Sequence, residues 1–379
     1  MFDYDQKYIE GKFRMETPPE LADKAPGQLC LTPFGWVLYY AASAVKGGDK
    51  LSAYERICIG LYMYQNKNWI PDELESNMLF VKVQKMLHQL RTTGSTNMPV
   101  DIDAVASGVA IVALSYGCET TLKHILGEPM SASEAFYTRL PDVYTMVNTE
   151  AVKAIPPHIR EAIDPEWLKR SYTKAVVIPA TFGSSNSAKE VFAKCPELIA
   201  PTEYAVNKIL PVLNQHKMNF RQIQFRNECV EWTDMLGRNI SIPRDVTLST
   251  TFATPKGNVD YSYTVPKDAS NSEHPFSELS MLANTTHNLD STVMAALAAH
   301  FAAKGIPMHD IHDCVMVHPI HMNEARVFVK WHTYKMIANQ EMRKIFNQIR
   351  HDDSIEFQAD IENVKKGLRR LRNTHLLYA

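Results

Sequence analysis

Apolar residues recur at intervals of three and four over much of the first hundred positions. This spacing places them on one face of a helix and predicts three amphipathic helices. A polar stretch that contains Gly94 and Pro99 then ends the helical pattern. The three helical segments are GWVLYYAASAV (35–45), LSAYERICIGLYMY (51–64) and MLFVKVQKMLHQL (78–90).

Short strands are predicted at two places that adjoin a carboxylate. Val100 and Ile102 alternate with aspartates, which indicates a strand that ends at Asp103. Much later in the chain, the apolar runs IPMHDI and CVMVHP flank His312 and Asp313. We expect a tight hairpin there, with buried flanking strands and with the Asp313 carboxylate at its tip.

The remainder is mostly helical, with one region rich in strands. Helical spacing continues to about residue 200, whereas residues 229–266 alternate β-branched and aromatic positions around Gly-containing turns and predict two hairpins. An Ala-rich helix is expected to begin at an N-cap formed by Asp290 or Ser291 and to stop at Gly305. The predicted fold class is therefore α+β and rich in helix.

Composition narrows the class of protein. The chain has 379 residues, of which 45% are hydrophobic and 22% charged, so it can bury a core and is not disordered. A net charge of -2 excludes a strongly basic coat for nucleic acid but leaves room for a local basic groove. Six isolated cysteines indicate free thiols rather than a disulfide scaffold. Without a signal peptide or a long apolar run, we expect a cytoplasmic protein with no membrane contact.

Two cations and one aromatic residue stand at helical spacing in RSYTKAVVIPATFG (170–183). Arg170 and Lys174 are four residues apart and share a helix face, and Phe182 follows two turns later. The cations of such a face can bind a triphosphate, and its aromatic ring can stack on a base. A solvated basic face with a Phe in the core explains the same residues, so this segment alone decides nothing.

The limits of this basic helix are also predicted. Asp164 and Pro165 form a good N-cap and first-turn pair. Pro179 deletes one helical hydrogen bond, so we expect it to kink or end the helix near Val177.

Taken together, the carboxylates and the basic helix indicate a chemistry that none of them indicates alone. Alone, Asp103 with Gly108 five residues later suits a helix start with a packing glycine, and Asp313 suits an ordinary turn. Together, the two carboxylates can hold two divalent cations while Arg170 and Lys174 neutralise leaving phosphates. The combination favours two-metal phosphoryl transfer. Asp101 is a rival on the same strand face, but the spacing to Gly108 favours Asp103.

The three segments resemble motifs of the phage and mitochondrial single-subunit DNA-dependent RNA polymerases. Motif A matches as Asp103 with Ser107-Gly108, motif B as Arg170, Lys174 and Phe182-Gly183, and motif C as His312-Asp313-Cys314. Further segments similar to the family are DKLSAYERI (49–57), WTDMLG (232–237), HNLDSTVM (287–294) and the terminal Leu377-Tyr378-Ala379.

This resemblance implies a polymerase palm, built on a small antiparallel sheet and interrupted by helical fingers. The palm would comprise residues 1–119 and 287–379, and the fingers residues 120–286. The implied reaction is the transfer of ribonucleotides onto RNA, directed by DNA, with release of pyrophosphate.

The resemblance also implies a role for each motif residue. Two Mg²⁺ ions would bind Asp103 and Asp313, the triphosphate would bind Arg170 and Lys174, and His312 would support the primer end. The sugar and base pocket would comprise Phe182 with Gly183, which close over the nascent base pair, His287, which senses the ribose 2′-OH, and Gly108, which leaves room for that hydroxyl.

Some positions depart from the family pattern. Phe182 replaces a Tyr whose hydroxyl helps to select the sugar, which predicts weaker rejection of deoxynucleotides. Ala110-Ile111 replaces a Gln-His pair, and Gly11-Lys12 is the only trace of a D-x-x-G-R element. Two alternatives therefore stay open. One is a DNA or mixed-sugar polymerase of the same superfamily, and the other is a non-catalytic DNA-binding scaffold subunit.

The resemblance finally implies partners. The chain is much shorter than typical family members and looks like the catalytic half of a phage polymerase that is split over two polypeptides. The expected partners are a DNA template, nascent RNA, ribonucleoside triphosphates, a second subunit with the thumb and N-terminal domain, and a single-stranded-DNA-binding or promoter-activating factor. A phage origin would place this heterodimer in the cytoplasm of an infected bacterium.

Overall fold

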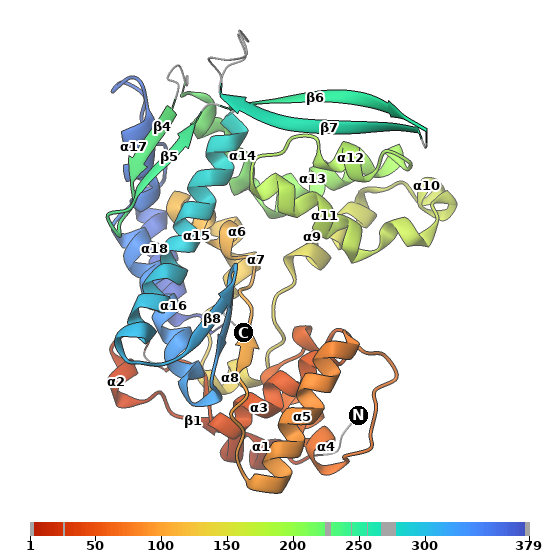
Figure 1. Ribbon diagram of the computed structural model, residues 1–379, viewed down its shortest axis with the longest axis vertical. Coiled ribbons are helices and arrows are strands. Elements are labelled where there is room, and N and C mark those ends of the chain that lie inside the picture. Colours follow the sequence, from red (N-terminus) through yellow and green to blue (C-terminus); the bar gives the residue numbers. More distant parts are fainter. Residues whose placement is uncertain are drawn as a thin grey trace.

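The computed structural model confirms a helix-rich α+β fold with small antiparallel sheets. The N-terminal helices lie at one end of the molecule and a long two-stranded ribbon lies at the other end (Figure 1). Among the described residues, no helix is both long enough and apolar enough to cross a membrane. The structure describes residues 4–25, 27–223, 229–243, 245–255, 257–266 and 278–375.

The N-terminal quarter contains the three predicted helices. α4 begins at a capping box, in which the side chains of Ser52 and Glu55 accept each other's backbone N–H groups. α3 packs against α4 and also against β3 (Val100–Ile102), so it supports the strand that leads to Asp103. The elements of this quarter are α1 (Gln6–Phe13), β1 (Arg14–Met15), α2 (Pro19–Ala22), β2 (Cys30–Leu31), α3 (Pro33–Ala41), α4 (Ala53–Gln65) and α5 (Asn77–Thr93).

A three-stranded antiparallel sheet in the order β3-β9-β8 joins two distant parts of the chain. β8 (Met308–Ile311) and β9 (Cys314–Val317) form the predicted hairpin. Val315 and Val317 are buried as expected, but Ile311 is 56% exposed, so the prediction that both strands are buried was wrong for β8. β8 is an edge strand, and its outer side therefore faces solvent.

Within the described part of the chain, nine α-helices follow β3 and lead to the β-rich region. The basic helix α11 runs to Thr181, so the expectation that Pro179 ends it near Val177 was wrong. Only two helical residues follow Pro179, so the hydrogen bond that it removes is lost at the very end of the helix. The nine are α6 (Ser107–Tyr116), α7 (Glu119–Leu126), α8 (Ala132–Tyr137), α9 (Val143–Ala154), α10 (Pro157–Ala162), α11 (Arg170–Thr181), α12 (Ser187–Val191), α13 (Ile199–Ile209) and α14 (Pro211–Arg221).

The predicted cap of α11 was also wrong. Asp164 accepts the backbone N–H of Glu166 and starts a separate 3-10 turn over Pro165–Leu168. α11 begins two residues after that turn, with Lys169 at its N-cap position and no side-chain cap. An Asp-Pro pair fits the start of either kind of helix, which is why the sequence did not separate them.

Among the described residues, the apolar side chains form one large core, one small core and a cluster of three buried residues, Leu21, Ala25 and Val327. The large core draws on elements from α1 to the C-terminal helix. The small core has seven buried residues around α10, α11 and α12, including Val176 and Phe192. The next residue of α11, Val177, belongs to the large core. α11 therefore lies between the two cores and packs into both.

Both predicted hairpins are present in the β-rich region. β4 (Cys229–Thr233) pairs with β5 (Asn239–Pro243), and β6 (Asp245–Thr254) pairs with β7 (Gly257–Pro266). The β6–β7 ribbon extends away from the body of the molecule (Figure 1), and Phe252, Tyr261 and Tyr263 are exposed on it. Lys256 of the turn and the aromatic C-terminal segment 377–379 lie outside the described residues.

The long helix α15 (Glu278–Ala303) begins earlier than predicted. Asp290 and Ser291 lie inside it rather than at its N-cap. The helix stops close to Gly305 as expected, and that glycine is in the left-handed region. The predicted boundary between residues 286 and 287 falls within this continuous helix. The remaining helices are α16 (Met322–Ala338), α17 (Glu341–Ile349) and α18 (Ile361–Asn373).

The close contact between α3 and α4 gives a test of this fold. A Cβ added at Gly60 would lie 2.1 Å from the backbone oxygen of Leu38, whereas nothing lies within 4 Å of a Cβ added at Gly11. Alanine favours both helices by about 1 kcal/mol. We expect Gly11→Ala to raise the free energy of unfolding slightly, and Gly60→Ala to lower it by about 1–3 kcal/mol through overpacking. Urea unfolding measures both, and equal effects would contradict the α3–α4 contact.

Candidate active site

The three-stranded sheet brings the two predicted carboxylates, Asp103 and Asp313, to the same end of the sheet. β3 and β9 are antiparallel, with Ile102 opposite Val315. Asp103 follows β3, and Asp313 comes two residues before Val315, at the turn of the hairpin. Antiparallel pairing therefore places these side chains next to each other, although 210 positions separate them in the sequence.

Their charges interact across this end of the sheet. Burial and the nearby Asp313 carboxylate raise the pKa of Asp103 to about 6, against opposing effects from the Ala104 N–H and from Lys50 and Lys174. By its accessible surface Asp103 is nevertheless exposed, so solvent screens part of this interaction. Like charges at short range disfavour a second ionisation. A divalent cation would relieve this repulsion.

A serine links Asp313 to a third carboxylate. The Ser107 hydroxyl lies 3.0 Å from Oδ2 of Asp313 and 3.1 Å from Oδ2 of Asp290. One hydroxyl carries one proton and can donate to only one of these carboxylates at a time. Burial and the charge of Asp313 raise the pKa of Asp290 to about 6. Ser107 therefore contacts Asp313 directly, and Asp290 of α15 contacts Ser107.

Asp101, the rival of Asp103, has other partners. Its carboxylate accepts a hydrogen bond of 2.8 Å from Nζ of Lys82. Burial and the neighbouring Asp101 raise the pKa of the Tyr40 hydroxyl above its usual range, and that hydroxyl bonds to the same carboxylate. Asp101 is thus held inside the fold by a cation and a phenol.

The basic helix presents its two cations beside an unpredicted tyrosine. Arg170 makes a two-pronged ion pair with Asp142, with distances of 2.5 and 3.0 Å. The ring of Tyr144 lies 5.1 Å from the Arg170 guanidinium and 5.9 Å from Nζ of Lys174. Lys174 is exposed, and its charge reaches Asp103. The cations and carboxylates therefore belong to one site.

Tyr144 connects the two halves of this site. Burial raises the pKa of Tyr144, and the negative charges of Asp313 and Asp103 add to this rise. Its phenol therefore lies within electrostatic reach of both carboxylates, while its ring lies against the cations. The sequence analysis missed Tyr144 and Asp142. The only signal for them was their position at the start of a helix, where Asp142 caps α9 through the N–H groups of Tyr144 and Thr145.

A second group of predicted residues lies together near the start of α6. The Phe182 and His287 rings stack with centroids 4.2 Å apart and 17° between their planes. A Cβ added at Gly108 would lie 3.8 Å from the Phe182 ring and 3.5 Å from a methyl of Thr181 and of Thr286. The predicted sugar residues are therefore neighbours in the fold.

His312 and Gly183 complete the predicted set. His312 adopts a left-handed backbone, with φ of 56°, at the hairpin tip. Burial and the nearby His312 lower the pKa of His287, so the hairpin tip faces α15. Gly183 is buried, has φ of 95° and follows the end of α11, a conformation that favours glycine.

The donor set suits magnesium rather than zinc. Within the described ranges, no group of three or more His, Cys, Asp or Glu side chains is close enough to hold a metal ion alone. Asp103 and Asp313 would supply carboxylate oxygens, and their mutual repulsion favours a cation between them. Mg²⁺ commonly binds one or two carboxylates and takes its other ligands from water and substrate phosphates. The residues present therefore fit this ion.

Comparison with known protein families gives a match. The model of a family described as DNA-dependent RNA polymerase matches residues 140–376, more than half of the chain. The matched range contains the basic helix, α15 and the hairpin with Asp313, whereas Asp103 and Gly108 precede it. No curated protein matches the chain.

The repulsion between the carboxylates gives a prediction for the metal-free protein. Because folding raises the pKa of Asp103 from 3.8 to about 6, this group costs stability as pH rises through that window. Asp103→Asn should therefore raise the free energy of unfolding by up to about 1 kcal/mol at pH 7.5, and less at pH 4.5. The measurement is urea unfolding with a chelator present.

Asp101→Asn is the matched control for this measurement. It lies two residues earlier and loses an ion pair with Lys82. We expect it to lower stability by about 0.5–1 kcal/mol at pH 7.5. If both variants destabilised the metal-free protein alike, the repulsion at Asp103 would be disproved.

Proposed function

Because the chain belongs to the family of DNA-dependent RNA polymerases, which are nucleotidyltransferases, we propose that it is the catalytic chain of such an enzyme and works by a two-metal mechanism. One observation carries the proposal. Two carboxylates from distant strands lie at one end of the sheet, and the charge of Lys174 on the basic helix reaches Asp103. Palm residues 1–119 and 287–379 with fingers 120–286 remain our proposed division.

The proposed reaction adds one ribonucleotide to RNA. The terminal 3′ oxygen of the RNA bonds to the α-phosphorus of the incoming triphosphate, its proton goes to solvent, and the bond to the β-phosphate oxygen breaks to release pyrophosphate. Two bound Mg²⁺ ions would activate the attacking oxygen and stabilise the leaving one. Asp103 and Asp313 would hold them, and Ser107 would orient the Asp313 carboxylate.

The cations of α11 would bind the triphosphate. Lys174 is exposed and adds a charge that can move toward the phosphates. Arg170 is held by Asp142, so its guanidinium is already oriented and loses little freedom on binding. The phenol of Tyr144, between these cations and the carboxylates, can donate a hydrogen bond to a phosphate oxygen. His312 would support the primer end.

The sugar pocket would lie around Gly108. Its lack of a side chain leaves the volume of about one methyl group beside Phe182, which suits the 2′ oxygen of a ribose. Gly183 would let the chain turn away after Phe182. This pocket favours RNA synthesis over the alternatives of DNA or mixed-sugar synthesis. A non-catalytic scaffold would have no need for a cation-binding pair of carboxylates.

A DNA template, nascent RNA and ribonucleoside triphosphates are the partners that the family implies. The second subunit, the promoter-activating or single-stranded-DNA-binding factor, the phage origin and the cytoplasm of an infected cell stay predictions of the resemblance. Co-purification of the chain from its native source tests the second subunit, and a lone chain with full activity would remove it.

The metal assignment predicts the effect of one substitution. Asp313→Asn should reduce Mg²⁺-dependent extension of an RNA primer on a DNA template by about 10³-fold, because metal ions contribute several kcal/mol to the transition state. The circular dichroism spectrum should not change. Asp310→Asn, an exposed carboxylate on the same hairpin, is the control and should keep wild-type activity. Substantial extension by Asp313→Asn would end the assignment. If the lone chain is inactive, the complex is assayed.

The sugar pocket predicts a gain of selectivity. Phe182→Tyr adds a hydroxyl beside Gly108 and His287, and one new hydrogen bond should increase the preference for ribonucleotides by about 3–10-fold. The measurement is the ratio of kcat/KM values for ribo- and deoxynucleotides. A wild-type chain that prefers deoxynucleotides would instead support the DNA polymerase alternative.

A further inference from the structure

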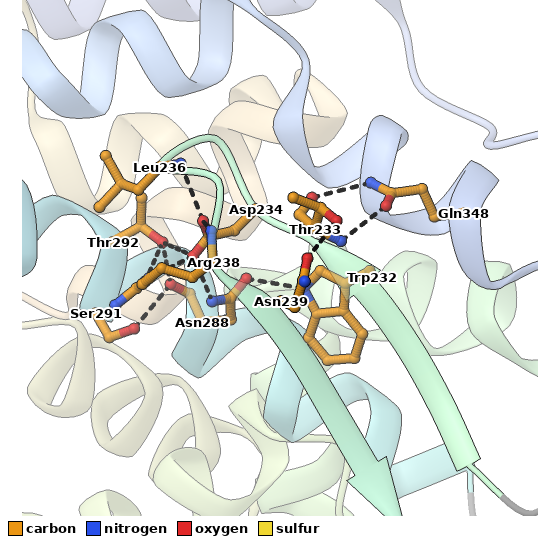
Figure 2. Close-up of polar contacts among 10 residues, drawn as sticks. All are labelled: Trp232, Thr233, Asp234, Leu236, Arg238, Asn239, Asn288, Ser291, Thr292 and Gln348. Carbon is orange, nitrogen blue, oxygen red and sulfur yellow. Dashed lines mark hydrogen bonds and ion pairs between the residues drawn. The ribbon is translucent and has the colours of Figure 1, made fainter.

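A buried aspartate joins the β4–β5 hairpin to α15. The Asp234 side chain is 1% exposed. Its Oδ1 accepts the backbone N–H groups of Leu236 and Arg238 at 2.9 and 3.0 Å and closes the turn. Its Oδ2 accepts Nε of Arg238 at 2.7 Å and Nδ2 of Asn288 at 3.2 Å. One carboxylate therefore serves both the turn and the helix (Figure 2).

Asn288 of α15 is fixed at both ends of its amide. Its oxygen accepts Nε1 of the buried Trp232 at 3.0 Å, while its nitrogen donates to Asp234. One turn later, the Thr292 hydroxyl accepts Nη2 of Arg238 at 2.9 Å and donates to the Asn288 carbonyl at 2.6 Å. The β4–β5 hairpin is therefore hydrogen-bonded to two positions on one face of α15, Asn288 and Thr292.

The opposite face of α15 carries two residues of the proposed site. At 100° per residue, Asn288 and Thr292 lie roughly 150° around the helix from His287 and Asp290. His287 stacks on Phe182, and Asp290 bonds to Ser107, which also bonds to Asp313. A rotation or slide of α15 would move both contacts at once.

The rest of α15 is held by apolar packing and by polar contacts of Thr286 with His216 (3.3 Å) and of His300 with Glu324 (2.7 Å). It contacts α6, α14, α16 and α17, and its buried side chains include Leu289, Val293 and Leu297. Apolar contacts are not directional, whereas hydrogen bonds need a defined distance and angle. Burial alone would raise the pKa of Asp234, but hydrogen bonds from Arg238 and Asn288 lower it, so the carboxylate is held ionised. Such a saturated buried network fixes one arrangement.

We propose that Asp234 and Asn288 form a positioning clamp that sets the rotation of α15 and thereby places His287 and Asp290 in the active site. The proposal rests on the proposed polymerase function. It assigns the β4–β5 turn a part in nucleotide selection, although none of its residues touches the substrate.

The hairpin has a second attachment that serves as the control. Gln348 of α17 bonds to the backbone of Thr233, where its Oε1 accepts the N–H at 2.8 Å and its Nε2 donates to the carbonyl at 3.1 Å. Figure 2 shows this pair on the other side of the hairpin from Asn288. Gln348→Ala removes two hydrogen bonds from the hairpin, and Asn288→Ala also removes two, but only the latter removes bonds between the hairpin and α15.

The first measurement does not need activity. The ¹H and ¹³C chemical shifts of the His287 ring report its stacking on Phe182, and His287→Gln assigns the signal. We expect Asn288→Ala and Asp234→Asn to shift this signal, and Gln348→Ala to leave it unchanged. An unchanged signal in Asn288→Ala, or equal changes in Asn288→Ala and Gln348→Ala, would overturn the clamp even if the polymerase assignment holds.

The second measurement uses primer extension well below the unfolding midpoint of each variant. Asn288→Ala should raise the KM for ribonucleotides and lower the preference over deoxynucleotides by about tenfold each, because a small misplacement of contact residues is costly. Gln348→Ala should keep both values. A wild-type chain without extension would refute the proposed function and leave the spectroscopic test of the clamp standing. Wild-type KM and selectivity in Asn288→Ala would overturn the clamp.

Discussion

The carboxylates of Asp103 and Asp313 carry like charges and must be held close together at one end of the three-stranded sheet. Asp103 and Asp313 repel each other, and burial together with this repulsion raises the pKa of Asp103. The buried strand residues beside them oppose it, since burying a Val or Ile side chain contributes about 1.5–3 kcal/mol. Val100 and Val317 pair across this sheet and are both 1% exposed. The apolar pairing of β3 and β9 therefore stabilises a charge arrangement that would otherwise separate.

Polar support for these charges comes from outside the sheet. Ser107 at the start of α6 and Asp290 in the middle of α15 approach Asp313 from behind. Arg170 and Lys174 come from α11, which packs in a different part of the molecule. Because each contact depends on a different element, the site exists only when the whole fold is assembled. This dependence explains why residues so distant in sequence act on one small volume.

Local patterns predicted the strands and hairpins around the site. The alternation at Val100 and Ile102 and the hairpin at His312 are properties of a few adjacent residues, and both are confirmed. The start of α15 was predicted wrongly, because Asp290 resembles an N-cap but bonds to Ser107 instead. A contact across 183 positions leaves no local signal, so the sequence alone did not reveal it.

Other parts of the site were beyond sequence reasoning for a similar reason. Arg170 was predicted to bind the triphosphate, and the spacing gave no sign of its ion pair with Asp142, 28 positions earlier. The stacking of Phe182 on His287 likewise depends on how α11 and α15 cross. Spacing identified the residue types that gather at the site. It did not identify which of them would contact each other.

The packing of α11 into two cores has a mechanical consequence. Val176 and Val177 are neighbours in sequence, yet they anchor the helix in separate apolar bodies. The smaller body has only seven buried residues and opens at a lower free energy than the larger one. The small core therefore limits how firmly α11 holds Lys174 in place. If heating loosened the small core first, Arg170 and Lys174 would become mobile while Asp103 and Asp313 stayed in place at the sheet.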